Sequence, residues 1–351
     1  MSLQAARLLR CLAEEGVTAE VVATNPLPPR GLAWAARASF LRTLLRELQY
    51  IASLIRKTPR CSVLHHFSAS DFYFFAHSVP ALLLAFCLRK RFILNYRGGN
   101  ARAFLKQWAW CAIPLLRLAD RVVVPSEFLR SVFTEFGLEA SLLPNIAATE
   151  TFAWKERHCF HPRFLIARNL EPMYNVECAL RAFRRIQVRY PDAQLGIAGD
   201  GSEKLRLAAL ASDWNLRGVT FHGSVAHHNL PSLYASHDIF MNSSNVDNFP
   251  GAIVEAACSG LPIVTTRAGG IPWMIQDREN GMLADLGDDA ALAAAAVEIV
   301  SDPSLGRDLA RRARSWAEQF SWKNVFPLLL ATYGSDSALG TVRVPEHEVL
   351  T

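Results

Sequence analysis

The stretch NSSNVDNFPGAIVEAACSGLPIVTTRAGGIPW, residues 242–273, has the pattern of a loop, a helix, a second loop, a strand and a third loop. Residues 252–259 have a helix-forming composition, and the Gly-Leu-Pro that follows is typical of a helix end. Residues 263–266 are a short β-branched run, as in a buried parallel strand. The adjacent Gly269 and Gly270 then allow a close approach of the backbone. This order of elements predicts a helix followed by a buried parallel strand.

Two carboxylates flank the start of the predicted helix. Asp247 precedes the helix, and Glu255 lies inside it, eight positions later. The backbone N–H groups from Gly251 onward lack partners at a helix start, so they favour an anion, as does the helix dipole. Glu255 could accept hydrogen bonds from a ribose diol beside such an anion. A surface aspartate and an ordinary helix glutamate are the simpler alternative for this pair alone, because short patterns recur by chance.

The complete string D-N-F-P-G-x-x-x-E-A-x-x-x-G-x-P-I-V-x-T-x-x-G-G-I-P resembles the donor-binding signature of the family 4 glycosyltransferases, retaining enzymes of the GT-B fold. The E-x7-E motif of that family falls on Asp247 and Glu255, with Asp in place of the first Glu. The resemblance implies that Glu255 binds the nucleotide ribose and that Asp247 lies by the donor sugar. It also implies two Rossmann-like domains whose parallel sheets face each other across a cleft, and a C-terminal helix that crosses back to the first domain.

Composition sets broad limits on the class of protein. The chain has 351 residues, 51% hydrophobic and 20% charged, which suits a globular protein of two domains. The net charge of +5 suits anionic ligands or an anionic membrane surface, and no nucleic-acid-binding pattern stands out. The seven cysteines form no C-x-x-C pair, so neither a disulfide framework nor a zinc site is indicated. Reduced thiols and the absence of a signal peptide predict a cytoplasmic protein.

Alternating strand and helix patterns divide the chain into three parts. We expect an acceptor domain at 1–148, a donor domain at 149–320, and a crossing helix with a tail at 321–351. The acceptor domain begins with a predicted helix at 3–16 and a predicted strand at 17–24. Members of the family start instead with a strand and a glycine-rich loop, so we expect either a start that is shortened relative to the family or a rearranged sheet.

Two other segments of the first half have a second interpretation. Residues 32–57 form a basic amphipathic stretch, either a solvated helix on the sheet or a helix at the acceptor side or at an anionic membrane surface. Residues 72–88 are apolar but contain His77, Ser78 and Pro80. A buried helix between two strands fits them better than a membrane span.

The acceptor side is predicted where two strands of the first domain end. The strand at 62–67 contains His65, and the strand at 91–96 runs into Arg97, Gly98 and Gly99. Free amides and a guanidinium at the carboxyl end of a parallel sheet could bind a hydroxylated or anionic acceptor. A tight turn and a core histidine are the alternatives.

The donor site is predicted around the second sheet. Arg168 follows its first strand, matches the phosphate-binding arginine of the family, and could pair bidentately with a diphosphate. We expect a catalytic set of Asp247, Arg168 and Glu255. The remaining donor-binding candidates are loop residues near the strand ends: Asn169, Gly199, Gly201, Gly223, Ser224, Val225, Asn248, Phe249, Pro250 and Gly251.

One position departs from the family pattern. The lysine that the family carries five residues after the arginine is Met173 here. The leaving group then has one cation fewer, a deficit that Arg267 or Arg97 could make up. No metal-ligand cluster such as D-x-D is present, so departure of the nucleoside diphosphate is expected to need no metal.

The resemblance therefore implies a retaining glycosyltransferase, which we expect to be metal-independent and without a bound cofactor. Its substrate would be a UDP- or GDP-sugar, and its acceptor a glycan, a lipid-linked or a small molecule. Contact with nucleic acid is not expected, and peripheral contact with the inner face of an anionic membrane is left open. An inactive nucleotide-sugar-binding pseudoenzyme is the alternative, and a sugar-nucleotide epimerase on the same fold fits less well.

Overall fold

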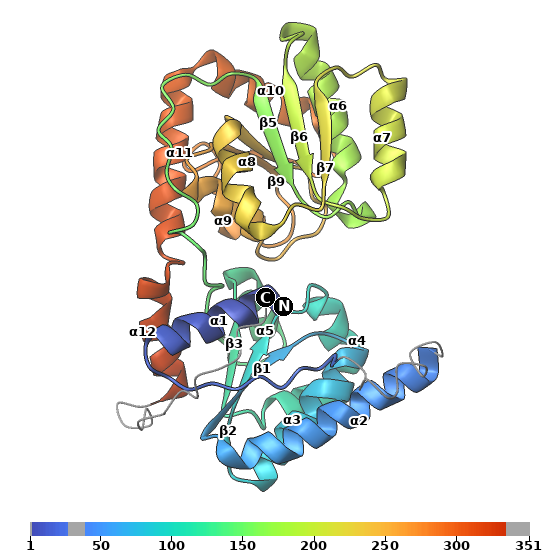
Figure 1. Cartoon of the computed structure of the whole chain (residues 1–351), viewed down its shortest axis with the longest axis vertical. Helices are drawn as coiled ribbons and strands as arrows, with labels where there is room; N and C mark the ends of the chain where they lie inside the picture. The colour runs from blue at the N-terminus through green and yellow to red at the C-terminus, as the bar shows by residue number, and fades with distance from the viewer. Residues whose placement is uncertain (1, 27–38, 335–351) are drawn as a thin grey trace. The chain divides into compact units, whose positions relative to one another are not determined.

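A computed structural model describes residues 2–26 and 39–334, which form two compact units (Figure 1). Within the described residues, the first unit comprises the chain up to Pro125, Leu129–Ile146 and the chain from Phe326. The second unit comprises Ser126–Phe128 and Ala147–Val325. The domain limits at 148/149 and 320/321 stay predictions.

The first unit is built on a parallel sheet of four strands in the order β1-β2-β3-β4. The strands are β1 (Val63–Ser68), β2 (Arg91–Tyr96), β3 (Arg121–Val124) and β4 (Ser141–Leu142). The helices are α1 (Ser2–Glu14), α2 (Ser39–Lys57), α3 (Val79–Cys87), α4 (Ala101–Leu116) and α5 (Glu127–Glu135). Pairing in register from Val63–Arg91 to Ser68–Tyr96 brings the carboxyl ends of β1 and β2 together.

The prediction of a strand at 17–24 is wrong. Residues 17–23 have no regular secondary structure, and in the described residues β1 pairs with β2 alone. The carbonyl of Val21 accepts a hydrogen bond from the Lys57 side chain at 2.9 Å instead of from a neighbouring strand. A β-rich composition gives a strand only where another strand supplies ladder partners.

The apolar segment 72–88 is split into two short elements. A π-helical turn, η3, covers Phe74–Ser78, and α3 follows directly from Val79. Among the described helices, none combines the length and the apolar character that a membrane span requires. The buried helix expected at 72–88 is found only in part, because Phe74, Ala81 and Leu82 are buried whereas Phe72, Leu83 and Phe86 are exposed.

The second unit contains a parallel sheet of six strands in the order β10-β9-β8-β5-β6-β7. The strands are β5 (Arg163–Ala167), β6 (Gln194–Ala198), β7 (Val219–Gly223), β8 (Ile239–Asn242), β9 (Ile263–Thr266) and β10 (Met282–Ala284). The helices are α6 (Val176–Arg189), α7 (Lys204–Asp213), α8 (Leu230–Ser236), α9 (Gly251–Cys258), α10 (Asp289–Ser301) and α11 (Pro303–Glu318). The strand order reverses between β5 and β8, which is the position where open α/β sheets bind ligands.

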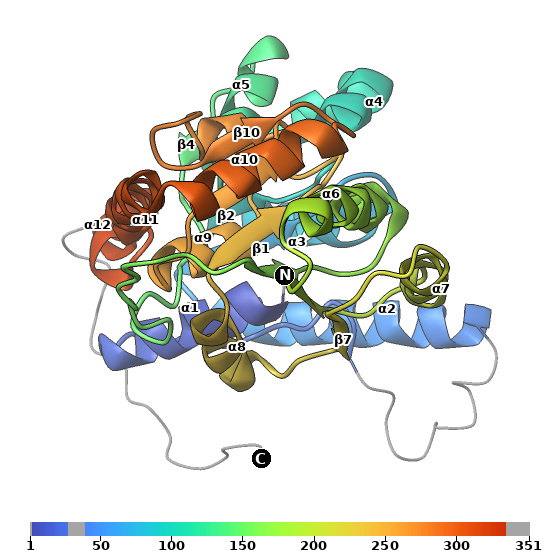
Figure 2. The same cartoon turned by 90° about the horizontal axis from the view of Figure 1, so that it is seen from above.

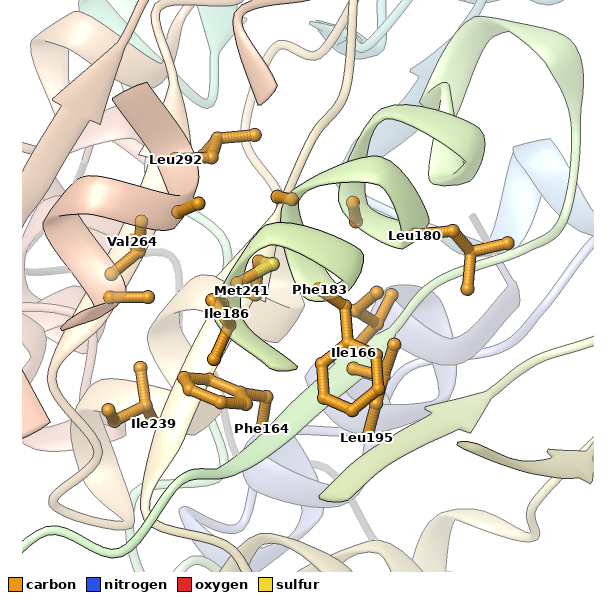
Figure 3. Packing of buried hydrophobic residues seen from close by; sticks show 14 of the residues in the cluster. Phe164, Ile166, Leu180, Phe183, Ile186, Leu195, Ile239, Met241, Val264 and Leu292 are labelled. Atoms are coloured by element: carbon orange, nitrogen blue, oxygen red, sulfur yellow. The ribbon is translucent and has the colours of Figure 1, made fainter. Parts of the chain in front are cut away.

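Both faces of this second sheet are buried. Phe164 and Ile166 of β5 pack with Phe183 of α6 in one apolar cluster (Figure 3). Leu165, between them in sequence, packs in a second cluster with Ile253 of α9 on the opposite face. The continuous apolar run of β5 is explained by this double coverage. The prediction of an α/β fold with two parallel sheets is confirmed.

The last helix, α12 (Trp322–Tyr333), joins the two units. It belongs to the second unit up to Val325 and to the first unit from Phe326. Within the first unit, the hydroxyl of Tyr333 lies 2.9 Å from Nδ1 of His65, and the carbonyl of Tyr333 accepts a hydrogen bond from Arg91 at 2.6 Å. These contacts attach the end of α12 to β1 and β2.

Candidate functional site

The site is centred on an ion pair at the switch point of the second sheet. Arg168 follows β5 and Asp247 follows β8, two adjacent strands. Nη2 of Arg168 lies 2.5 Å from Oδ2 of Asp247, and both side chains are largely buried. Burial raises the pKa of Asp247, although the positive charge of Arg168 acts in the opposite direction. Arg168 and the N–H of Asn248 therefore offset part of the cost of burying this carboxylate.

The guanidinium of Arg168 has further binding capacity. Its Cζ lies 3.9 Å from the centre of the Tyr174 ring, so the aromatic face supports it on one side. Its Nε atom is shielded from water and has no hydrogen-bond partner among the described residues. A buried donor without a partner costs about 1–3 kcal/mol. A phosphate oxygen at this point would remove that cost.

The position of Asp247 is fixed by the glycine pair after β9. The N–H of Gly270 donates to the carbonyl of Asp247 at 2.7 Å. A Cβ atom on Gly269 would lie 2.2 Å from the same carbonyl, and one on Gly270 would lie 2.1 Å from the carbonyl of Asn248. Gly269 also has a φ of +50°. The close backbone approach expected of these glycines is therefore made to the acidic loop itself.

Buried polar residues also hold the loop that carries Asp247, through hydrogen bonds that do not involve the glycine pair. Asn242 donates to Thr265 at 2.9 Å, and Ser244 donates to Asn242 at 2.9 Å. Ser243 donates to the carbonyl of Asn175 at 2.8 Å, which ties this loop to the loop after β5. The two loops that supply Arg168 and Asp247 are thus joined by hydrogen bonds besides the ion pair.

Glu255 lies in the middle of α9 and is held by two side chains that the sequence did not single out. The hydroxyl of Tyr234, on α8, donates to Oε2 of Glu255 at 3.0 Å. Nε2 of His227 lies 3.5 Å from Oε1 of the same carboxylate. Tyr234 is fully buried, and burial, with the Glu255 charge, raises the pKa of its hydroxyl far above the ordinary value. Tyr234 therefore stays a proton donor to Glu255 over the whole working pH range.

Arg168 and Glu255 belong to one electrostatic environment. Burial has the largest effect on the pKa of Tyr234 and raises it, whereas the positive charge of Arg168 lowers it. The Arg168–Asp247 pair follows β5 and β8, and Glu255 lies on α9, the helix that follows the Asp247 loop.

The predicted glycines after β6 and β7 allow adjacent loops to pack closely. The N–H of Arg168 donates to the carbonyl of Ala198 at 2.8 Å, and a Cβ atom on Gly199 would lie 1.8 Å from the carbonyl of Arg168. A Cβ atom on Gly201 would lie 2.4 Å from the carbonyl of Leu170. These glycines thus contact the loop after β5, so they support the position of Arg168.

The other donor-binding candidates surround this centre. Gly223 ends β7 with a φ of +67°, and its carbonyl accepts from the N–H of Gly199 at 2.8 Å. The ring of Phe249 packs edge-on against Phe320 at 5.0 Å. The remaining candidates lie on the same loops, exposed at Asn169, Ser224 and Gly251, partly buried at Val225 and Asn248, and buried at Pro250. Their ligand roles stay predictions.

Arg267, one of the two arginines expected to replace the cation missing at Met173, is paired with other residues. Met173 is 45% exposed in the 3-10 turn η4 (Pro172–Tyr174), where its carbonyl accepts from the N–H of Asn245 at 2.9 Å. Nη2 of Arg267 lies 2.9 Å from Asp277, and its Nε lies 3.5 Å from Asp285. These carboxylates already balance the charge of Arg267, so it is a poor candidate for the missing cation.

The predicted acceptor residues form a separate polar cluster in the first unit. Arg97 donates to Asn95 at 3.1 Å and to Asn145, and its Cζ lies 4.7 Å from the Phe67 ring centre. Burial lowers the pKa of Arg97 to about 10. Asn95 also lies 3.0 Å from Nε2 of His65. Burial and the positive charge of Arg97 lower the pKa of His65 to about 3. His65 is therefore a neutral hydrogen-bonding group at physiological pH.

The glycines next to Arg97 permit a tight packing arrangement. A Cβ atom on Gly98 would lie 2.1 Å from Oγ of Ser70 and 2.8 Å from the hydroxyl of Tyr96, while Gly99 is exposed. In the described part of the chain, no group of three or more His, Cys, Asp or Glu residues is placed to hold a metal ion.

Comparisons with known proteins identify chains that are similar to this one. Residues 157–316 match the family model described as glycosyl transferases group 1. N-acetyl-alpha-D-glucosaminyl L-malate synthase of Bacillus anthracis is 33% identical over 154 residues, 43% of this chain and 40% of that protein. A GDP-mannose-dependent alpha-(1-6)-phosphatidylinositol monomannoside mannosyltransferase of Mycolicibacterium smegmatis is 27% identical over 244 residues, 61% of this chain and 64% of that protein. These matches thus span less than two thirds of the relatives' own length.

Solved structures share the fold at low sequence identity. Sucrose-phosphate synthase from Thermosynechococcus elongatus has a TM-score of 0.71 at 17% identity, covering 94% of this chain and 92% of that one. Anabaena HepE in complex with UDP and glucose has a TM-score of 0.70 at 18% identity, covering 93% and 89%. The chain therefore has the GT-B fold of glycosyltransferases, and its residues 157–316 match the glycosyl transferases group 1 family.

Proposed function

We propose that this protein is a glycosyltransferase of family 4 that moves a sugar from a nucleoside-diphosphate sugar to an acceptor. The observation that carries the proposal is the buried Arg168–Asp247 pair at the switch point of the second sheet, beside Glu255 on α9. Such a site offers a cation for a diphosphate and carboxylates for sugar hydroxyls. The relatives support both UDP and GDP as the nucleotide, since solved neighbours contain UDP and a curated relative is named for GDP-mannose.

Each group has a distinct role in this proposal. Arg168 and the first N–H groups of α9 bind the diphosphate, because both present donors to an anion. Glu255 accepts hydrogen bonds from the ribose hydroxyls while Tyr234 holds its other oxygen. The nucleobase lies near Gly223, Ser224 and Val225. Asp247 lies by the sugar and exchanges part of its contact with Arg168 for the ligand.

The reaction follows from these roles. The bond between the anomeric carbon and the diphosphate oxygen breaks, and the electron pair leaves with the nucleoside diphosphate. An acceptor hydroxyl then bonds to the anomeric carbon and passes its proton to the departing diphosphate oxygen, with retained configuration. Arg168 stabilises the charge that develops on the leaving group, because its guanidinium is already oriented in a largely buried site. Departure of the leaving group depends on Arg168 and the α9 amides, without a metal.

The acceptor is proposed to bind through the first unit. Arg97 and the exposed Gly99 follow the carboxyl end of β2 and present donors to a hydroxylated molecule, and His65 of β1 holds Asn95 beside Arg97. A glycan, a lipid-linked or a small-molecule acceptor fits this chemistry. The cytoplasm, which holds the pool of nucleotide sugars, is the proposed location.

A two-part experiment tests the proposal. Thermal unfolding with UDP, GDP, ADP and their sugars identifies the nucleotide, since a ligand that binds the native state raises the melting temperature. Release of nucleoside diphosphate with and without candidate acceptors then measures turnover. We expect Arg168→Gln to abolish the thermal shift and turnover, whereas Arg217→Gln, an exposed arginine of the same unit, should leave both unchanged.

The other outcomes identify the alternatives. Binding of a nucleotide sugar without hydrolysis or transfer would indicate the pseudoenzyme, for which the exposed Met173 is the motivation. Conversion of the sugar without an acceptor would indicate an epimerase. Absence of any nucleotide shift would remove the proposal.

A further inference from the structure

A half-buried arginine at the end of β2 has only uncharged partners among the described residues. Strand β2 pairs with β1, and the two strands lie side by side (Figures 1 and 2). Arg97, which follows β2 directly, donates to the side-chain oxygens of Asn95 and Asn145. The ring centre of Phe67, on β1, lies 4.7 Å from its Cζ atom. Two amides and one aromatic ring support the guanidinium, but none of them carries a negative charge.

The chain of hydrogen bonds behind Arg97 is neutral as well. A guanidinium only donates, so the oxygen of the Asn95 amide faces Arg97 and its NH2 group faces Nε2 of His65, at 3.0 Å. Nε2 of His65 therefore accepts, and the ring proton on Nδ1 donates to the hydroxyl oxygen of Tyr333 at 2.9 Å. A proton on Nε2 would set two donors against each other. The chain from Tyr333 to Asn95 thus holds the guanidinium without neutralising it.

Arginines in comparable environments of the second unit have a carboxylate. Arg168, after β5, lies 2.5 Å from Asp247. The buried Arg157 lies 3.4 Å from Asp238. In the part of the chain that the structure describes, no carboxylate pairs with Arg97, and burial lowers its pKa to about 10 without an acid to oppose the shift. A cation that is partly removed from water without a counter-charge is stabilised by an anion that reaches it.

The backbone beside Arg97 leaves room for such an anion. Gly98 and Gly99 follow it and have no side chains, and Gly99 is exposed. No hydrogen bond joins Nη2 of Arg97 to another described residue, and a guanidinium fork matches the oxygens of a carboxylate or a phosphate. The carboxyl ends of parallel strands are also where α/β sheets bind ligands.

These features together point to the charge of the ligand that the first unit binds. We propose that Arg97 binds an anionic group of the acceptor, a carboxylate or a phosphate, and that the hydrogen-bond chain from Tyr333 holds the guanidinium in place for it. Because this site is the proposed acceptor site, the assignment rests on the proposed function and narrows its acceptor to anionic molecules.

Titration with inorganic phosphate and with acetate tests the anion site directly. Thermal unfolding is measured on the protein saturated with its preferred nucleoside diphosphate, and on Arg168→Gln without nucleotide, so that the donor site does not compete. We expect at least one of the two anions to raise the melting temperature, and the stronger one identifies the group that is bound. Arg97→Gln should lower its affinity at least about tenfold, and Arg97→Lys should lie between, because it keeps the charge but loses the fork.

The control for Arg97 is Arg60→Gln, which removes an exposed arginine of the same unit and should leave anion binding unchanged. Circular dichroism should show all variants folded. Absence of a shift with both anions, or an affinity that Arg97→Gln does not change, would overturn the proposal. An equal loss of nucleoside diphosphate affinity in Arg97→Gln would assign the arginine to the donor and would overturn it too.

Tyr333→Phe tests the hydrogen-bond chain. The substitution removes the oxygen that accepts from His65 and keeps the ring, whose centre lies 5.7 Å from the imidazole centre. We expect it to lower the affinity for the anion roughly two- to tenfold and to leave nucleotide affinity unchanged. Nitrogen NMR of the wild type should show the His65 proton on Nδ1. A proton on Nε2, or wild-type anion affinity of Tyr333→Phe, would refute the positioning role.

Three acceptors on one carbon skeleton extend the test to transfer. Glycerol is neutral, glycerol phosphate carries a phosphate, and glycerate carries a carboxylate. We expect a charged member to release nucleoside diphosphate faster than glycerol does, with a KM that Arg97→Gln raises at least about tenfold. Preference for glycerol would contradict the proposal. Transfer to none of the three concerns the proposed function alone, because the anion titration decides the role of Arg97 without turnover.

Discussion

The hydroxyl of Tyr234 offers a test of how Glu255, the proposed ribose-binding carboxylate, is positioned. Tyr234→Phe removes a single oxygen atom, which donates to Oε2 of Glu255 at 3.0 Å. The ring stays between Phe152, at 5.3 Å, and Phe240, at 6.0 Å, so the packing of α8 against the sheet is retained. The substitution therefore changes the support of Glu255 and little else.

The size of the effect follows from the environment of Glu255. A hydrogen bond to a charged acceptor contributes about 1.5–3 kcal/mol. The carboxylate is 18% exposed, so water replaces part of the lost contact and the lower figure applies. A loss of about 1.4 kcal/mol is a tenfold change in affinity. We expect Tyr234→Phe to raise the dissociation constant for the nucleotide, and the KM for the donor, about tenfold with little change in kcat.

Isothermal titration with the preferred nucleoside diphosphate measures this effect directly. Tyr190→Phe is the control, since its hydroxyl contacts the exposed Ser301 at 3.1 Å. Glu255→Gln alone should also weaken binding, and the double variant with Tyr234→Phe should be weaker by less than the sum of the two. If Tyr234→Phe leaves the dissociation constant unchanged while Glu255→Gln raises it, Tyr234 only fills the core and our reasoning is refuted.

Four other predictions use different parts of the structure. Arg168→Ala should weaken nucleoside diphosphate binding at least about tenfold and leave nucleoside binding unchanged; equal losses in titration would contradict its contact with phosphate. Gly269→Ala should lower the melting temperature and the transfer rate, because its Cβ would lie 2.2 Å from the carbonyl of Asp247 at a φ of +50°; wild-type values for both would count against it. Arg157→Lys should lower the free energy of unfolding in urea by about 3 kcal/mol, because the buried guanidinium donates to backbone carbonyls at the ends of α8 and α9. A decrease below about 1 kcal/mol would contradict this prediction. Burial lowers the pKa of His66 to about 4, below the 6.5 of the unfolded chain, so stability is complete above pH 6.5 and falls toward pH 4; we expect a loss of about 2 kcal/mol at pH 5 in urea unfolding, which a flat pH profile would exclude.

Much of the second unit could be predicted from the sequence because its signals are local. The β-branched run of β9 and the Gly-Leu-Pro stop of α9 are set by residues that are adjacent in the chain. The positions of Arg168 and Asp247 at neighbouring strand ends also follow, since parallel strands place their carboxyl ends at one edge. β10 was missed because a strand of three residues is too short to show a periodic pattern.

The features that the sequence did not predict depend on contacts between distant residues. Tyr234 is an ordinary helix residue until the fold places its hydroxyl against Glu255. Arg267 resembled a spare cation, but Asp277 and Asp285, which engage it, follow later in the chain. The strand expected at 17–24 had a suitable composition and lacked a neighbouring strand. Composition indicates which secondary structure a segment can form, whereas contacts with neighbouring segments decide whether that structure forms.

The backbone contacts between Gly269, Gly270 and the loop of Asp247 have a practical consequence for altering the sugar that the protein is proposed to transfer. A library confined to the acidic loop would vary side chains while the main chain beneath them stays in place, so Asn248 and Phe249 are suitable positions for diversification. Substitutions at either glycine would instead displace the whole loop at once. Directed evolution of this scaffold should therefore keep the two glycines constant and search the segment that rests on them.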